Sequence, residues 1–316
     1  MTRPRVVALV GPTAAGKTSL ALELAEWLGA EIVSADSRQI YRGLDVGTAK
    51  PSAAERVRVP HHCLDVVGPE ETYDAARFRD TAATAIEAIH GRGKHVLVVG
   101  GTGLYVRALL RGLCAAPPRV HALRRLLEGV AATEGPAVLH RRLAHVDPVA
   151  AARIHPHDAV RAVRALEVAL STGRRLSAWQ EAHGFSERPY DTFTIGLDRP
   201  AGELETRIVA RTRAMVAAGL LEEVRGLVRC IAADAPAWRT VGYREMRACV
   251  EGVVDLPAAV AAIVRATRRF AKRQRTWFRA DPGLVWRDPE RERSQIHEEV
   301  RSFLAPGQIA KPQGAR

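Results

Sequence analysis

The residues best suited to chemistry lie near the N-terminus, between Gly11 and Thr18. This segment reads Gly-Pro-Thr-Ala-Ala-Gly-Lys-Thr and matches the pattern GxxxxGK[ST]. In such a loop the glycines let backbone N–H groups surround phosphate oxygens, and the following helix adds its partial positive charge. Lys17 would neutralise the outer phosphate, and the Thr18 hydroxyl would hold Mg²⁺ as a cofactor. The segment therefore predicts a site for a di- or triphosphate, ATP included, and leaves open which bond breaks.

Asp36 is the second candidate for chemistry, in the segment Ser34-Ala35-Asp36-Ser37-Arg38-Gln39. It follows a predicted strand directly, so we expect it at the same sheet edge as the phosphate-binding loop. A carboxylate in that position could act as a general base or help to hold a metal. Asp is also a favoured N-cap of helices, and the sequence alone does not separate the two interpretations.

A glycine-rich segment, Gly100-Gly101-Thr102-Gly103, follows the apolar run His95–Val99. ATPases with a phosphate-binding loop usually carry an Asp at the end of such a strand, where it helps to hold the metal. Its absence here favours group transfer, with the polyphosphate as substrate or leaving group, over hydrolysis that drives a machine. The glycines would let a ligand approach the Thr102 hydroxyl, or would only form a tight turn between strand and helix.

The segment Arg265–Arg279 contains seven basic residues and no acidic one. Five of them fall at helical spacing on one face, which would repel itself unless it met phosphate groups. The whole chain carries a net charge of +12, and such a field attracts nucleic acid. We therefore expect this face to bind nucleic acid; a solvated helix face is the alternative. The five residues are Arg265, Arg268, Lys272, Arg275 and Arg279.

Short apolar runs alternate with helical patterns through the first hundred residues, which indicates a parallel sheet covered on both faces. The predicted class is therefore α/β, with a P-loop NTPase-like parallel sheet core and a helical insertion. Loops at the carboxyl ends of the strands would carry the site. We predict strands at Val6–Val10, Glu31–Ala35, Cys63–Val67, His95–Val99 and Phe193–Leu197, and helices at Lys17–Leu28, Tyr73–His90, 201–231 and 256–280.

The pattern changes at Ala115-Ala116-Pro117-Pro118, after which no strand is predicted before Phe193. Residues 118–192 are therefore expected to form a helical insertion. The catalytic core would consist of residues 1–117 and 193–285, including the basic helix. Residues 286–316 would add a C-terminal helix and, from residue 305, a disordered tail.

Composition excludes several other classes of protein. No run of eighteen uncharged apolar residues occurs, which excludes a membrane-spanning helix. The four cysteines are scattered without CxxC spacing, which argues against a disulfide framework and against a zinc site. We therefore expect a cytoplasmic protein with no membrane partner.

Together these motifs resemble those of one family, the tRNA dimethylallyltransferases, which are the tRNA isopentenyltransferases of bacteria. The matching segments cover most of the chain, and seven matches in order are far more specific than one. They are Gly11–Thr18, Ser34–Tyr41 with Asp45–Pro51, Val59–His62, Gly100–Tyr105, Arg164–Glu167, Val241–Glu245 and Ala271–Arg279.

The resemblance implies transfer of a dimethylallyl group from dimethylallyl diphosphate to the exocyclic N6 amine of adenosine 37, beside the anticodon of tRNA. Asp36 corresponds to the family's general base, and Arg211 to an arginine on the diphosphate. Lys17, Arg211 and Mg²⁺ would stabilise the departing diphosphate. The diphosphate site would comprise Gly11, Thr13, Ala14, Ala15, Gly16, Lys17, Thr18 and Arg211. The tRNA would be bound by the insertion, including Arg161, and by Asp36, Ser37, Arg38, Gln39, Thr102, Arg268, Lys272 and Arg275.

The sequence departs from the family pattern at two positions. Val160 stands where the family usually has Gln, which removes the amide of one implied tRNA contact, and Ala15 replaces a common Ser. Other functions remain as alternatives: prenyl transfer to free AMP or ATP, a P-loop nucleotide kinase, and a non-catalytic RNA-binding ATPase. The basic insertion and basic helix favour tRNA, since a mononucleotide needs no such surface. No obligate protein partner is implied.

Overall fold

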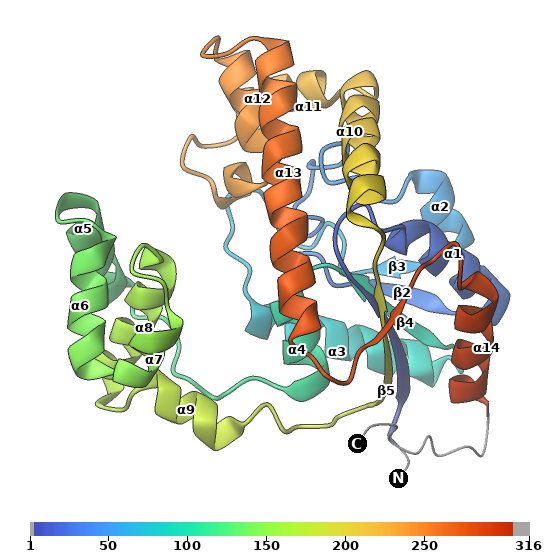
Figure 1. Cartoon of the computed structure of the whole chain (residues 1–316), viewed down its shortest axis with the longest axis horizontal. Helices are drawn as coiled ribbons and strands as arrows, with labels where there is room; N and C mark the ends of the chain where they lie inside the picture. The colour runs from blue at the N-terminus through green and yellow to red at the C-terminus, as the bar shows by residue number, and fades with distance from the viewer. Residues whose placement is uncertain (1–2, 306–316) are drawn as a thin grey trace. The chain divides into compact units, whose positions relative to one another are not determined.

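The structure is a computed structural model that describes residues 3–305 of the chain (Figure 1). The chain forms two compact units, the first from the stretches up to Leu110 and from Arg188 onward, the second from Arg111–Glu187. Among the described residues no helix is both long and apolar enough to cross a membrane. The predicted disordered tail lies outside the described residues beyond Ala305.

The first unit is built on a six-stranded parallel sheet in the order β3-β2-β4-β1-β5-β6. The central strand β1 is apolar from Val6 to Val10, and all five of these residues are fully buried. A strand that is buried on both faces reads as a continuous apolar run, which is why the sequence shows it clearly. The strands are β1 (Arg5–Val10), β2 (Glu31–Ser34), β3 (His61–His62), β4 (Val96–Gly100), β5 (Asp191–Leu197) and β6 (Val285–Arg287).

Helices cover both faces of this sheet. The chain crosses from β1 to β2 in one direction and from β3 to β4 in the other, so right-handed crossovers place α1 (Lys17–Leu28) and α3 (Ala75–Gly91) on opposite faces. On the first face α1 packs with α14 (Arg293–Leu304), where Leu24 of α1 meets Ile296 in one apolar cluster. Two further helices flank the sheet, α2 (Ala53–Arg58) and α4 (Gly103–Arg111).

A helical layer of the first unit packs against the loop that follows β2. The loop residue Gly47 donates its N–H to the Tyr243 hydroxyl at 3.0 Å, and a Cβ on Gly47 would lie 2.4 Å from the Tyr243 ring. Glu223 accepts the N–H groups of Asp45 and Val46 at 3.0 and 2.8 Å. This loop is therefore fixed by helices from the far end of the sequence. The layer comprises α10 (Ala201–Ala217), α11 (Leu220–Cys230), the 3₁₀ turn Pro236–Arg239, α12 (Tyr243–Val250) and the long α13 (Leu256–Arg279) (Figure 1).

The structure corrects three of the predicted elements. The strand predicted at Cys63–Val67 is wrong, because the paired residues are His61 and His62, and Cys63 then turns into the left-handed region at φ 63°. The predicted helix 201–231 is two helices, separated at Gly219. The short edge strand β6 was not predicted, since three half-buried residues give no periodic signal.

The second unit is helical throughout its described residues. It begins and ends a few residues before the insertion predicted at 118–192, because the extended chain after α4 already belongs to it. Glu167 is fully buried and accepts hydrogen bonds from the N–H of Val120 at 2.8 Å, from Arg124 at 3.1 Å and from Arg164 at 2.9 Å. The helices are α5 (His121–Thr133), α6 (Pro136–Val146), α7 (Pro148–Arg153), α8 (Ala159–Thr172) and α9 (Leu176–His183).

Glu167→Ala should destabilise the second unit, because it leaves a backbone N–H and two guanidinium groups without their acceptor. Removing one member of a buried ion pair costs about 3–5 kcal/mol, and we expect the lower value since Arg124 and Arg164 are partly exposed. Hydrogen–deuterium exchange of peptides from residues 111–187 in the whole protein measures the loss. Glu128→Ala is the matched control, because Glu128 pairs with the same Arg124 but is exposed. Equal protection in both variants would contradict the assignment.

Candidate active site

The phosphate-binding loop lies at the carboxyl end of β1, and its lysine is the first residue of α1. The Lys17 ammonium donates to the carbonyl oxygens of Gly11 at 3.0 Å and Pro12 at 2.7 Å. Burial, together with the Arg211 cation, lowers the pKa of Lys17 to about 8, although the Asp36 carboxylate acts in the opposite direction. The predicted residues Lys17, Asp36 and Arg211 therefore lie within electrostatic reach of one another.

Asp36 follows β2 and stands at the edge of two cavities. Its Oδ1 atom accepts the N–H of Arg38 at 2.8 Å, and the residues that follow form a turn and no helix. The N-cap interpretation is therefore wrong. Asp36 lines a small cavity together with Lys17 and Thr18, and it also lines a second cavity of about 170 Å³ together with Arg211. The carboxylate thus stands between the phosphate-binding loop and a second binding space.

The second cavity is strongly basic and has one aromatic side. Its walls come from the loop after β2, from α10, from the segment before α12 and from α13. Such a lining suits a nucleotide, because guanidinium groups bind phosphate and a ring can stack on a base. The charged and aromatic residues are Asp36, Arg38, Arg211, Arg239, Phe270 and Arg273.

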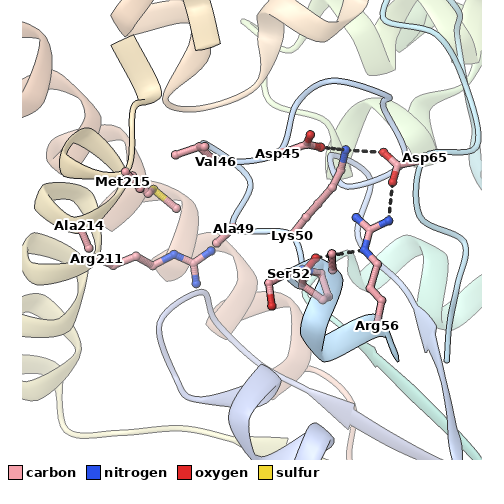
Figure 2. A pocket seen from close by; sticks show the side chains of 13 residues that line it. Asp45, Val46, Ala49, Lys50, Ser52, Arg56, Asp65, Arg211, Ala214 and Met215 are labelled. Carbon is pink, nitrogen blue, oxygen red and sulfur yellow. Dashed lines mark hydrogen bonds and ion pairs between the residues drawn. The ribbon is translucent and has the colours of Figure 1, made fainter. Parts of the chain in front are cut away.

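A third cavity, of about 650 Å³, has an apolar wall that includes Val46, Ala214 and Met215 (Figure 2). Arg211 and Met215 line both this cavity and the second one. The charges on its far wall are paired: the buried Lys50 ammonium contacts Asp45 and Asp65, each at 2.6 Å. Arg211 is therefore the unpaired charge at the boundary between an apolar space and a basic one, within the part of the chain that the structure describes.

The glycine run after β4 serves the packing of α13. A Cβ on Gly101 would lie 2.1 Å from the Gln274 amide, and one on Gly103 would lie 2.0 Å from the Trp277 ring. Close packing against α13, which neither interpretation from the sequence included, therefore accounts for Gly101 and Gly103. Thr102 has a different role, because its hydroxyl oxygen accepts the N–H of Ser37 at 3.0 Å and so holds the loop next to Asp36.

Gln274 is a site residue that the sequence reasoning missed. Its buried amide accepts the N–H of Thr13 at 2.8 Å and donates to the carbonyl oxygen of Gly101 at 2.9 Å. It therefore joins the phosphate-binding loop to the turn that carries Thr102. The sequence signal for Gln274 is an uncharged amide within the basic run Arg265–Arg279, where a residue that only faced solvent or RNA would more commonly be charged.

The basic face of α13 is only partly free. Arg275 donates to Asp198 at 2.6 Å and to the Arg199 carbonyl oxygen at 2.7 Å, and Arg268 contacts Glu205 at 2.5 Å. The argument from self-repulsion was therefore wrong for these two residues, because acidic partners come from other elements. Lys272 is exposed.

The remaining predicted tRNA residues fall in different places. Arg38 lines the second cavity, but the Gln39 amide is bonded within the protein, to the Ser34 hydroxyl at 3.0 Å and to the Thr48 and Ala49 carbonyl oxygens at 3.2 Å. Arg161 belongs to the second unit, where it is exposed on α8. Within the first unit the structure thus brings together the predicted diphosphate residues, Asp36 and Arg38, and does not bring Arg268 to this constellation.

Fold and site define a parallel α/β protein in which the carboxylate of Asp36 lines both a cavity at the Gly11–Thr18 loop and a basic cavity. The family model described as IPP transferase matches residues 39–281. The chain belongs to this family of prenyltransferases, and it is an enzyme.

Individual relatives agree over most of the chain. A tRNA dimethylallyltransferase of Geobacter metallireducens is 53% identical over 285 residues, covering 90% of this chain and 92% of the relative. One of Anaeromyxobacter dehalogenans is 54% identical over 285 residues, covering 90% and 95%. The solved tRNA isopentenylpyrophosphate transferase of Bacillus halodurans superposes with a TM-score of 0.70 at 37% identity, covering 96% of this chain and 97% of that one.

The lowered pKa of Lys17 predicts a pH-dependent affinity for inorganic diphosphate. The cation is present below about pH 8 and is lost as the pH rises through that value, so the dissociation constant should rise there, by about tenfold per pH unit at most. Lys17→Arg keeps its charge and should lack this rise, which also corrects for titration of the ligand itself. Calorimetric titrations between pH 7 and pH 9.5 make the comparison. Parallel profiles for the two proteins would contradict the prediction.

Proposed function

We propose that this protein transfers a dimethylallyl group from dimethylallyl diphosphate to the N6 amine of adenosine 37 of tRNA and releases diphosphate. One observation carries the proposal. The Asp36 carboxylate lines both the cavity of the phosphate-binding loop and the basic cavity beside it. A base in that position can take a proton from an acceptor nucleotide while the donor's diphosphate is held next to it.

The reaction follows from the charges in the site. The amine nitrogen forms a bond to C1 of the dimethylallyl group, and the bond from C1 to the diphosphate oxygen breaks with its electron pair going to the diphosphate. Asp36 accepts the proton that the amine loses. Lys17 and Arg211 stabilise the negative charge that grows on the leaving group, and the buried position strengthens both interactions. The apolar cavity beside Arg211 and Met215 offers space for the five-carbon group.

The residues present fit a Mg²⁺ ion. The Thr18 hydroxyl, at the start of α1, and the Asp36 carboxylate line one cavity with Lys17. Mg²⁺ prefers oxygen ligands and is commonly held by one or two protein oxygens together with phosphate oxygens and water. Bound there, the ion would neutralise charge on the diphosphate. Thr18 would be its protein ligand, and Asp36, which the reaction uses as the base, lies beside it in the lining of the same cavity.

The acceptor must be presented as an unstacked base. Asp36 is half-buried and lines the second cavity, so the amine of an adenine that stays stacked in the anticodon loop could not reach it. Arg38, Arg239 and Arg273 line the same cavity and supply charge for the flanking phosphates. We further propose that the second unit, including Arg161, and the exposed Lys272 of α13 contact the rest of the tRNA, and that the protein acts in the cytoplasm without a protein partner.

Incubation with dimethylallyl diphosphate, Mg²⁺ and unmodified tRNA, followed by nucleoside mass spectrometry, tests the proposal directly. N6-isopentenyladenosine at position 37 is the expected product. Free AMP and ATP serve as competing acceptors and should remain unmodified, because they lack the polyanion that the basic surfaces bind. Modified AMP with unmodified tRNA would assign the protein to mononucleotide prenylation.

Asp36→Asn should lower the single-turnover rate by about 10² to 10⁴, because general-base catalysis contributes about that much. The Asn oxygen can still accept the N–H of Arg38, so the turn should persist and the affinities for tRNA and diphosphate should change far less. Rapid-quench assays with saturating substrates measure the chemical step. Asp36→Ala, which loses the turn contact as well, shows how much of any effect is structural. A near-normal rate for Asp36→Asn would mean that the base lies elsewhere.

Arg265→Ala combined with Lys272→Ala, at two exposed positions of the predicted basic face, should weaken tRNA binding and reduce its salt dependence. Each lost phosphate contact should lower the log–log slope by about 0.7–0.9. A variant with the same change of charge on α14, Arg293→Ala with Arg301→Ala, is the control. Filter binding across a salt series measures both. If both variants match the parent, this face of α13 is solvated and binds no RNA. Arg275 is left unchanged, because its ion pair with Asp198 is structural.

A further inference from the structure

Two arginines of the β5–α10 region form hydrogen bonds to carbonyl groups of the phosphate-binding loop. Arg199 lies two residues after β5 and donates its Nε–H to the Ala15 carbonyl oxygen at 3.0 Å. Arg207, two turns further along in α10, donates its Nε–H to the Ala14 carbonyl oxygen at 2.9 Å. Two consecutive carbonyl groups of the loop are therefore held by guanidinium groups.

These contacts are part of a fixed network. The Arg199 side chain is only 4% exposed, and its Nη2 atom donates to Glu290 at 2.6 Å. Glu290 also lies 3.6 Å from Arg207, so a single carboxylate from the segment after β6 holds both arginines. The Arg275 guanidinium in turn binds the Arg199 carbonyl oxygen. The position of Arg199 is thus determined at its side chain and at its backbone.

These two hydrogen bonds fix the directions of the N–H groups in the same peptides. The C=O and N–H of one trans peptide point in opposite directions. The Ala15 carbonyl group points outward to Arg199, so the N–H of Gly16 in the same peptide group points to the opposite, inner side of the loop. The N–H of Ala15, which lies opposite the carbonyl group held by Arg207, donates to the Pro12 carbonyl oxygen at 3.3 Å and closes the turn of the loop. Ala14 also has φ 65°, a conformation that a non-glycine residue keeps only where its surroundings enforce it.

We propose that Arg199, assisted by Arg207, is a positioning residue for the diphosphate of the donor. It touches neither substrate, and it acts by orienting the N–H of Gly16 toward the diphosphate oxygens, while Arg207 supports the turn that the Ala15 N–H closes. The guanidinium charges also polarise the two peptide groups and so strengthen their N–H groups as donors. The inference rests on the proposed function and adds two residues that the loop motif itself does not contain.

The test measures binding of inorganic diphosphate, with Mg²⁺ and without tRNA, by calorimetry. Arg199→Met removes the charge but keeps the bulk, and we expect the dissociation constant to rise by about tenfold or more, the effect of losing a charge-assisted hydrogen bond. Arg199→Lys, which can still donate to the Ala15 oxygen, should bind more tightly than Arg199→Met. Arg213→Met, at an exposed position of α10, is the matched control and should bind inorganic diphosphate as the parent does.

Steady-state kinetics separate positioning from general destabilisation. Arg199→Met should raise KM for dimethylallyl diphosphate and leave KM for tRNA unchanged, whereas a loss of folded protein would lower kcat alone. Arg207→Met, at a more exposed position, supplies the measurement if Arg199→Met does not fold, and should weaken diphosphate binding severalfold. Parental affinity in both Met variants overturns the proposal. A parent protein that binds diphosphate but modifies no tRNA would instead overturn the proposed function, and the binding comparison would still stand.

Discussion

Two cations, Lys17 and Arg211, lie within electrostatic reach of each other on either side of Asp36, and burial lowers the pKa of each of them. Holding two positive charges together away from water costs free energy, and Asp36 is a single carboxylate that can offset only part of it. A polyanion that enters this site completes the balance of charge. Within the proposed function, the leaving diphosphate is such a polyanion, so the same two charges would serve both the binding of the donor and its reaction.

That constraint explains why the loop is supported from so many directions. A flexible loop would let the two cations move apart and would lose the attraction for the diphosphate. Gln274 of α13 binds the loop on one side, and Arg199 and Arg207 bind it on the other. Because these residues all lie after β5 in the sequence, the loop gains this support only when the C-terminal part of the first unit has folded onto it.

The sequence predicted the elements whose signal is local and failed where the signal is distant. The helix Lys17–Leu28 and the strands beside it were found because apolar runs bounded by glycine mark them within a few residues. The strand predicted at Cys63–Val67 was wrong because the run was apolar but its backbone turns into the left-handed region. Gln274 was missed, and Arg275 was assigned to RNA, because the partners of both lie far away in sequence.

Contacts between residues that are distant in the sequence also explain two glycines of the family motifs. Gly47 of one motif has no side chain because Tyr243 of another occupies the space, and Gly101 is matched in the same way to Gln274. Such pairs serve the packing of the fold, and a protein without catalytic activity could retain all of them. Asp36 is different, because the packing does not require its carboxylate. The hydrogen bond it makes in the described structure is to the Arg38 N–H of its own turn. A carboxylate at this position therefore says more about the reaction than the longer motifs around it.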